Sequence, residues 1–153
     1  MTAVSARVPG QQRLGQVVSV YGGQGGVGKT LFCTGLASLL AATGYRVVLI
    51  DLTLRLGSDL ALSLDLEPDP NFGDLLPAID TVVPRTLENY LLVHGSGIRL
   101  LAAPASPDRW QRIREGDVEK AIHLLRYRYD FVVVDLASSF DSRVLAVLPI
   151  SDR

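Results

Sequence analysis

The glycine-rich stretch GQGGVGKT, from Gly23 to Thr30, constrains the fold of this chain more than any other feature. It fits the pattern G-x-x-x-x-G-K-[ST], with the apolar run VVSVY before it and a helical pattern after it. Small residues let successive backbone N–H groups turn toward phosphate oxygens, and the following helix adds the positive end of its dipole. We therefore predict a strand, a phosphate-binding loop and a helix in this order.

The loop also predicts a ligand. The predicted phosphate-binding residues are Gly23, Gln24, Gly25, Gly26, Val27, Gly28, Lys29 and Thr30. The Lys29 ammonium would reach the β- and γ-phosphates, and the Thr30 hydroxyl would bind Mg²⁺. Such a loop also needs an acid at the end of a distant strand, which the run FVVVD supplies through Asp135. These residues together indicate a nucleoside triphosphate with Mg²⁺.

The same letters also fit a dinucleotide-binding loop. Gly23, Gly25 and Gly28 satisfy G-x-G-x-x-G, and Asp51 ends the next apolar run, where such folds keep a ribose-binding acid. That loop has no use for a lysine followed by a threonine, whereas the triphosphate loop needs both. We favour the triphosphate and keep NAD as the alternative.

Apolar runs alternate with helical patterns along the rest of the chain. The predicted strands are 17–21, 46–51, 98–104 and 131–135, and the predicted helices are 29–42 and 116–129, with shorter helical pieces such as NFGDLL between prolines. In the first helix, apolar residues recur on one face at Phe32, Leu36, Leu39 and Leu40. This alternation predicts an α/β fold with a mostly parallel sheet flanked by helices.

Composition excludes several classes of protein. The 153 residues suit one domain, and 15 basic against 16 acidic residues give a net charge of −1, which argues against DNA or an anionic membrane as partner. A single cysteine, Cys33, excludes an internal disulfide and is expected to be a small buried residue. No apolar run is long enough to span a bilayer. We expect a soluble, cytoplasmic protein, in which Trp110 within RWQRIR lies at a solvated or partner-facing edge.

Four segments together resemble the MinD/ParA superfamily of deviant Walker ATPases. They are the glycine loop, VVLIDLTLRLGSDLALSLDLEPDPNFGDLL, GIRLLAAPASPD and YDFVVVDLASSF. Within the superfamily, the CpaE/TadZ branch associated with pilus assembly is most similar. The resemblance implies an ATP- and Mg²⁺-binding switch in which Asp51 and Asp135 are the catalytic acids behind the metal.

The resemblance also implies partners and alternatives. The full-length form would be an ATP-dependent homodimer that acts with pilus or secretion-system proteins, at a membrane or a cell pole. A ParA-type DNA-partition or septum-site ATPase and a non-functional fragment are the alternatives. Residues 1–16 are expected to be a flexible lead-in, and 17–153 the N-terminal part of a nucleotide-binding domain that is truncated at the C-terminus. Base recognition and any membrane contact would then come from segments beyond Arg153, and 17–21 would be an apolar edge strand.

Departures from the family pattern concern hydrolysis. Gln24 stands where the family usually has a lysine that reaches the partner's phosphates, and Thr53 stands where a second acid is usual. Leu31 replaces a residue that often carries a hydroxyl, and the usual Pro-Gly switch is replaced by residues 136–139, LASS. A neutral amide cannot supply the positive charge that stabilises a phosphoryl transition state. We therefore expect nucleotide binding with slow or absent hydrolysis; Asp59 could compensate for the lost acid or only cap a helix.

Overall fold

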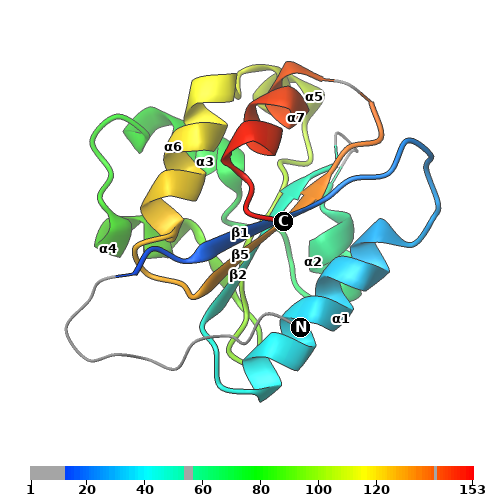
Figure 1. The fold of residues 1–153 in the computed structure, drawn as a ribbon. Coiled ribbons are helices and arrows are strands. Elements are labelled where there is room, and N and C mark those ends of the chain that lie inside the picture. Colours follow the sequence, from blue (N-terminus) through cyan, green and yellow to red (C-terminus); the bar gives the residue numbers. More distant parts are fainter. Residues whose placement is uncertain (1–12, 54–56, 140) are drawn as a thin grey trace.

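The computed structural model describes residues 13–53, 57–139 and 141–153, and most of the predicted lead-in lies outside these ranges. A five-stranded sheet with the order β1-β5-β2-β4-β3 lies between two layers of helices (Figure 1). The strands are β1 Gln16–Val20, β2 Val47–Leu52, β3 Leu92–Val93, β4 Arg99–Leu101 and β5 Phe131–Leu136. All neighbouring pairs are parallel except β3 with β4. The predicted α/β class with a mostly parallel sheet is confirmed.

Each face of the sheet has its own apolar core. The helices are α1 Lys29–Ala42, α2 Asp59–Ser63, α3 Phe72–Leu75, α4 Pro84–Leu87, α5 Pro107–Gln111, α6 Glu115–Leu125 and α7 Ser142–Val147, with 3-10 turns at Leu76–Ala78, Glu88–Tyr90 and Leu148–Ile150. Val48 and Ile50 of β2 face the core under α3 to α7, and Val47 and Leu49 face the core under α1 and α2. β2 is buried on both faces, which explains its unbroken apolar sequence.

The predicted elements agree closely with the structure along most of the chain. The helix 29–42 has the predicted bounds, NFGDLL forms α3 and the turn after it, and the strands β1, β2 and β5 differ from prediction by a residue at their ends. The strand expected over 98–104 is shorter, the helix expected over 116–129 ends at Leu125, and the two-residue β3 was not predicted. A strand of two residues is too short to show an alternating pattern. Among the helices of the described ranges, none has the length and hydropathy that spanning a bilayer requires.

The buried face of α1 carries small residues. Cys33 and Ala37 are fully buried against the sheet, as expected for Cys33, whereas Phe32 is 60% and Leu39 64% exposed. The apolar pattern predicted the helix correctly, but two of the residues that defined it point to solvent in this chain. Small side chains let the helix lie close to the sheet, and Leu36 and Leu40 are only partly buried at its flank.

The expected position of Trp110 is wrong. Its side chain is 8% exposed and belongs to the core beneath α5, α6 and α7, together with Ile113. The neighbouring arginines remain outside, and Arg109 pairs with Asp74 at 2.8 Å. The segment is therefore amphipathic: its apolar residues are core, and only its arginines form an edge.

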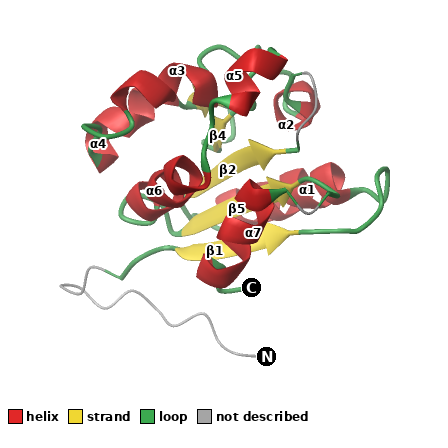
Figure 2. Cartoon of the chain, turned by 90° about the horizontal axis from the view of Figure 1, so that it is seen from above, coloured by secondary structure: helices red, strands yellow, loops and turns green. Residues whose placement is uncertain are grey.

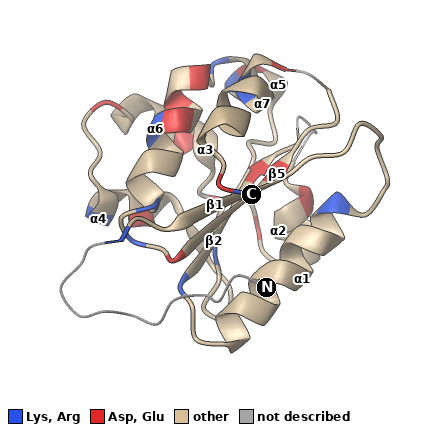
Figure 3. Ribbon diagram, in the orientation of Figure 1, with Lys and Arg blue, Asp and Glu red and all other residues tan. Residues whose placement is uncertain are grey.

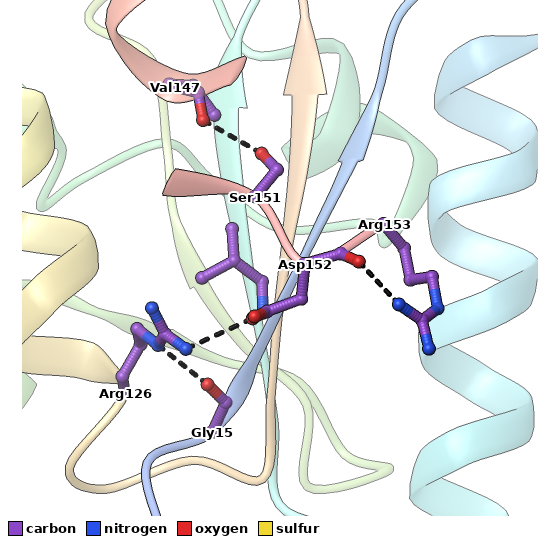
Figure 4. Close-up of polar contacts among 7 residues, drawn as sticks. Gly15, Arg126, Val147, Ser151, Asp152 and Arg153 are labelled. Atoms are coloured by element: carbon purple, nitrogen blue, oxygen red, sulfur yellow. Dashed lines mark hydrogen bonds and ion pairs between the residues drawn. The ribbon is translucent and has the colours of Figure 1, made fainter. Parts of the chain in front are cut away.

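Residues 151–153 lie along the outer edge of β1 (Figure 4). Ser19 N–H donates to the Arg153 carbonyl at 3.0 Å, and Arg153 N–H donates to the Val17 carbonyl at 3.2 Å, which is the pattern of a parallel pair. The Asp152 carboxylate accepts from Val17 N–H at 2.8 Å and from the Arg126 guanidinium at 3.1 Å. The expected edge strand is thus confirmed, since β1 ends the strand order, and the last residues of the chain pair with part of its outer edge.

The packing of α1 leads to a first prediction. Ala37→Leu should lower the free energy of unfolding by about 1–3 kcal/mol, because extra methylenes have no room in a fully buried position. Ser38→Leu is the matched control on the exposed side of the same helix and should change it by about 0.5 kcal/mol or less. Urea unfolding of both variants measures the difference. Equal effects would contradict the assigned buried face.

Candidate functional site

The carboxyl ends of three parallel strands bring the predicted site together. Val20 of β1 pairs in register with Asp135 of β5, and Asp135 pairs with Asp51 of β2. The arrowheads of β1, β5 and β2 point in the same direction (Figure 2), so the loop that follows β1 and both acids occupy one edge of the sheet. Parallel sheets place ligand sites at this edge.

The glycine loop has a backbone that favours glycine at two positions. Gly26 has φ 77° and Gly28 has φ 87°, in the left-handed region that side chains with a Cβ rarely adopt. Gly28 directly precedes α1, so the N-terminus of this helix opens onto the loop. The loop borders a cavity of about 240 Å³, lined by Gly25, Gly26, Gly28, Lys29, Thr30, Thr53, Asp59, Leu136, Ala137 and Ser138. Gly23, Gln24 and Val27 are exposed on the loop.

Lys29 joins the loop to the opposite wall of this cavity. Its ammonium donates to the Ser138 hydroxyl at 2.7 Å and to the Gln24 carbonyl at 3.3 Å. Figure 3 shows the basic start of α1 across from acidic residues at the end of β5 and in α2. A cation held at a helix N-terminus beside backbone N–H groups is suited to bind anionic oxygens.

Thr30 and Asp135 form the second part of the site. The Thr30 hydroxyl donates to Asp135 Oδ2 at 2.7 Å, while Asp135 Oδ1 is buried with no hydrogen-bond partner among the described residues. Burial raises the pKa of Asp135 to about 6; the Thr30 hydrogen bond opposes this shift and the nearby Asp51 charge adds to it. A buried carboxylate oxygen without a partner, next to a hydroxyl, fits the needs of a hard cation such as Mg²⁺.

Asp51 is held by its own segment. Its carboxylate accepts from Thr53 N–H at 3.0 Å, from the hydroxyls of Thr53 and Ser58 at 2.6 Å each, and from Leu60 N–H at 3.2 Å. Burial raises its pKa, and these hydrogen bonds oppose the shift. The arrangement ties the end of β2 to the start of α2. The role of Asp51 behind a metal stays a prediction.

The structure decides between the two alternatives for Asp59 and places Ser138 at the site. Ser58, and not Asp59, caps α2 with its side chain, which accepts from Ala61 N–H at 3.1 Å. Asp59 instead lines the cavity, as does Ser138. Ser138 comes two residues after the end of β5, within the segment 136–139 that the resemblance placed at the family's switch. Leu31 is 76% exposed and does not line the cavity.

A strand, a glycine-rich loop and a helix beside an acid on a parallel strand define the class of P-loop nucleotide-binding proteins. A family model described as the CobQ/CobB/MinD/ParA nucleotide binding domain matches residues 18–125, and the chain belongs to this family.

Known proteins are similar over most of the chain. The antiactivator FleN of Pseudomonas aeruginosa is 29% identical over 134 residues, which are 86% of this chain and 46% of FleN. A ParA family ATPase from Chlorobium tepidum has the same fold, with a TM-score of 0.82 at 23% identity over 94% of this chain and 59% of that one. Cobyrinic acid a,c-diamide synthase from Mycobacterium smegmatis, solved with an ATP analogue and magnesium, has a TM-score of 0.72 at 25% identity over 90% and 57%. The chain spans about half the length of the curated relatives it matches.

The shifted pKa of Asp135 predicts a dependence of stability on pH. The native state binds this proton more tightly than the unfolded chain, whose ordinary pKa is 3.8. The free energy of unfolding should therefore fall as pH rises from about 4 to about 6, by at most roughly 2–3 kcal/mol. Asp135→Asn keeps an acceptor for Thr30 but cannot ionise. Without Mg²⁺ it should be more stable than the wild type at pH 8, and this advantage should vanish near pH 4.

Urea unfolding across this pH range tests the prediction, with Asp108→Asn as the control at an exposed acid. A stability difference for Asp135→Asn that is the same at every pH would contradict the assignment.

Proposed function

We propose that this chain is an ATP-binding switch domain of the MinD/ParA type, with weakened hydrolysis. One observation carries the proposal: Lys29 and Thr30 line the same cavity at the N-terminus of α1, and the Thr30 hydroxyl donates to the buried Asp135 carboxylate behind it. The lysine suits phosphate oxygens, and the pair suits the metal that accompanies them. Residues 17–153 would form the N-terminal part of the nucleotide-binding domain.

The residues present fit Mg²⁺ bound together with a nucleotide. The described residues contain no group of three or more histidine, cysteine, aspartate or glutamate side chains that could hold a metal alone. Mg²⁺ usually keeps several waters and is held by one or two protein oxygens plus phosphates, so Thr30 and Asp135 suffice. The ion would neutralise phosphate charge. The similarity to a synthase that was solved with an ATP analogue and magnesium supports this pair of cofactors.

Hydrolysis needs groups that this site has lost. Gln24 is exposed on the loop and is neutral, so it cannot bring a positive charge to a partner's phosphates. Thr53 lines the cavity, but its hydroxyl donates to Asp51 and offers no carboxylate to orient a water. These features support a site that binds Mg-ATP but hydrolyses it slowly. Asp51 and Asp135 would be the acids available for the reaction.

The biological role is the furthest part of the proposal. By resemblance, the full-length form would be an ATP-dependent homodimer of the CpaE/TadZ type that assembles or localises a pilus or secretion system. A ParA-type partition or septum-site role fits family membership equally well. Salt-sensitive binding to nonspecific duplex DNA would favour the partition role, because that interaction depends on phosphate contacts.

Nucleotide binding should be visible as a thermal shift. At about 100 times its dissociation constant, Mg-ATP should stabilise the 153-residue chain by about 2.7 kcal/mol and raise Tm by roughly 5 °C or more. Lys29→Ala should lose this shift. Lys120→Ala is the matched control, since Lys120 lies on α6 and pairs with Asp80 at 3.3 Å, away from the cavity. A wild type without a shift would refute the proposed binding.

Turnover should be slow for an identifiable reason. We expect phosphate release from Mg-ATP to be close to the Lys29→Ala background, because a missing trans-acting cation can cost about 10³–10⁵ in rate. Gln24→Lys should raise the rate if dimers form. Release by the wild type at a rate ordinary for the family would contradict weakened hydrolysis.

A further inference from the structure

A second cavity lies at the edge of the sheet opposite to the candidate nucleotide site, where the arrows of β2 and β5 begin in Figure 2. It has a volume of about 300 Å³, and the turn between β3 and β4 borders it. Three arginines from different segments line this amino-end cavity: Arg46 precedes β2, Arg99 begins β4 and Arg128 precedes β5. Parallel pairing of the three strands brings these side chains around one cavity, which the proposed nucleotide binding does not use.

Two of the arginines are held in place by acids. Arg46 contacts Asp130 through Nε at 3.3 Å and through Nη2 at 2.9 Å. Arg128 contacts Glu88 through Nε at 2.9 Å and through Nη2 at 2.8 Å. A guanidinium carries five N–H groups, and Nη1 of both arginines has no partner within the described ranges. Since these pairs already order the two side chains, a ligand that contacts them costs little further conformational entropy.

Arg99 differs from the other two because its charge is not compensated. Its side chain is half-buried, and its guanidinium makes no hydrogen bond or ion pair in the part of the chain that the structure describes. Around the cavity, Glu88 and Asp130 balance two arginines and leave an excess of one positive charge. A partly desolvated charge without a partner is unfavourable. An anion beside Arg99 would remove this cost.

The phenol of Tyr129 adds a neutral donor to the cavity. Tyr129 is 7% exposed and lines the cavity, and its hydroxyl has no hydrogen-bond partner among the residues that are described. Unlike the sealed oxygen of Asp135, this hydroxyl retains contact with solvent. Burial raises the pKa of Tyr129 to about 12; the Glu88 charge adds to this shift, and the three arginines oppose it. The hydroxyl therefore keeps its proton at neutral pH and can donate it to a ligand.

We propose that the amino-end cavity binds the phosphate group of a small ligand, with Arg99 as the main cationic contact and the Tyr129 hydroxyl as a second donor. The donors come from three different strand ends, which suits a tetrahedral phosphate whose oxygens point in several directions. A planar carboxylate would be satisfied by one guanidinium. The volume is at the lower end of the range for ligand pockets, so the ligand is little larger than its phosphate group.

Titration of the isotope-labelled 153-residue chain with inorganic phosphate, followed by amide NMR spectra, tests this inference. The glycine loop can also bind phosphate, so the measurement must separate the two sites. Amide signals of Ser96 and Gly97 report on the amino-end cavity, and those of Gly26 and Gly28 report on the loop. We expect saturable shifts of the first pair that sodium chloride at equal ionic strength does not reproduce.

Arg99→Gln should weaken this phosphate binding at least about ten-fold, because charge-assisted hydrogen bonds are lost. Arg112→Gln is the matched control: this exposed arginine follows α5 and does not line the cavity, so the variant should bind phosphate as the wild type does. If Arg99→Gln fails to fold, Tyr129→Phe, which loses only the hydroxyl, must weaken binding by about the same factor.

Three outcomes would overturn the inference. Signals of Ser96 and Gly97 that do not shift, or shift without saturation, would exclude a phosphate site at this edge, whatever the loop binds. Equal affinity in Arg99→Gln would exclude the assigned cation. Acetate that binds as tightly as phosphate would show that the cavity responds to charge alone. Because the two sites have separate signals, failure of nucleotide binding at the loop would leave this inference standing.

Discussion

The buried carboxylate of Asp135 is the constraint on which the site depends. It is fully shielded from solvent, and the Thr30 hydroxyl contacts only one of its oxygens. A charge in such a place is unfavourable unless a proton or a cation accompanies it, which is why its pKa rises to about 6. The sheet supports this carboxylate at a cost in stability that a bound cation would offset. A residue that only fills the core would be more stable as an apolar side chain, so the loss of stability indicates a role for the carboxylate.

The geometry around Asp135 follows from the parallel sheet. Register places Asp135 between Val20 and Asp51, so the glycine loop begins beside it. The helix that follows the loop returns over the same strands because its buried face carries Cys33 and Ala37. The position of Lys29 therefore depends both on the order of the strands and on the packing of α1 against them.

The sequence was sufficient for features that depend on local pattern. Apolar runs predicted the long strands, and glycine followed by a helical pattern predicted α1 with its bounds. Packing partners could not be predicted in this way. Three features depend on segments that are far apart in the chain: the buried side of α1, the burial of Trp110 and the contact of Lys29 with Ser138. In the last case the two residues are 109 positions apart. Local periodicity contains no information about such pairs. A tryptophan among arginines was therefore predicted to lie at an exposed edge, although it is buried.

The departures from the family pattern separate two energetic tasks. Binding uses groups that touch phosphates in the ground state, and the proposed phosphate-binding residues Gly26, Gly28 and Lys29 have a suitable backbone and charge. Turnover needs groups whose contacts strengthen only as charge shifts in the transition state. By resemblance, Gln24 and Thr53 stand at positions of the second kind, which is the basis of the proposed weakening of hydrolysis. A site altered in this direction would hold ATP for longer, which suits a switch whose output is the bound state.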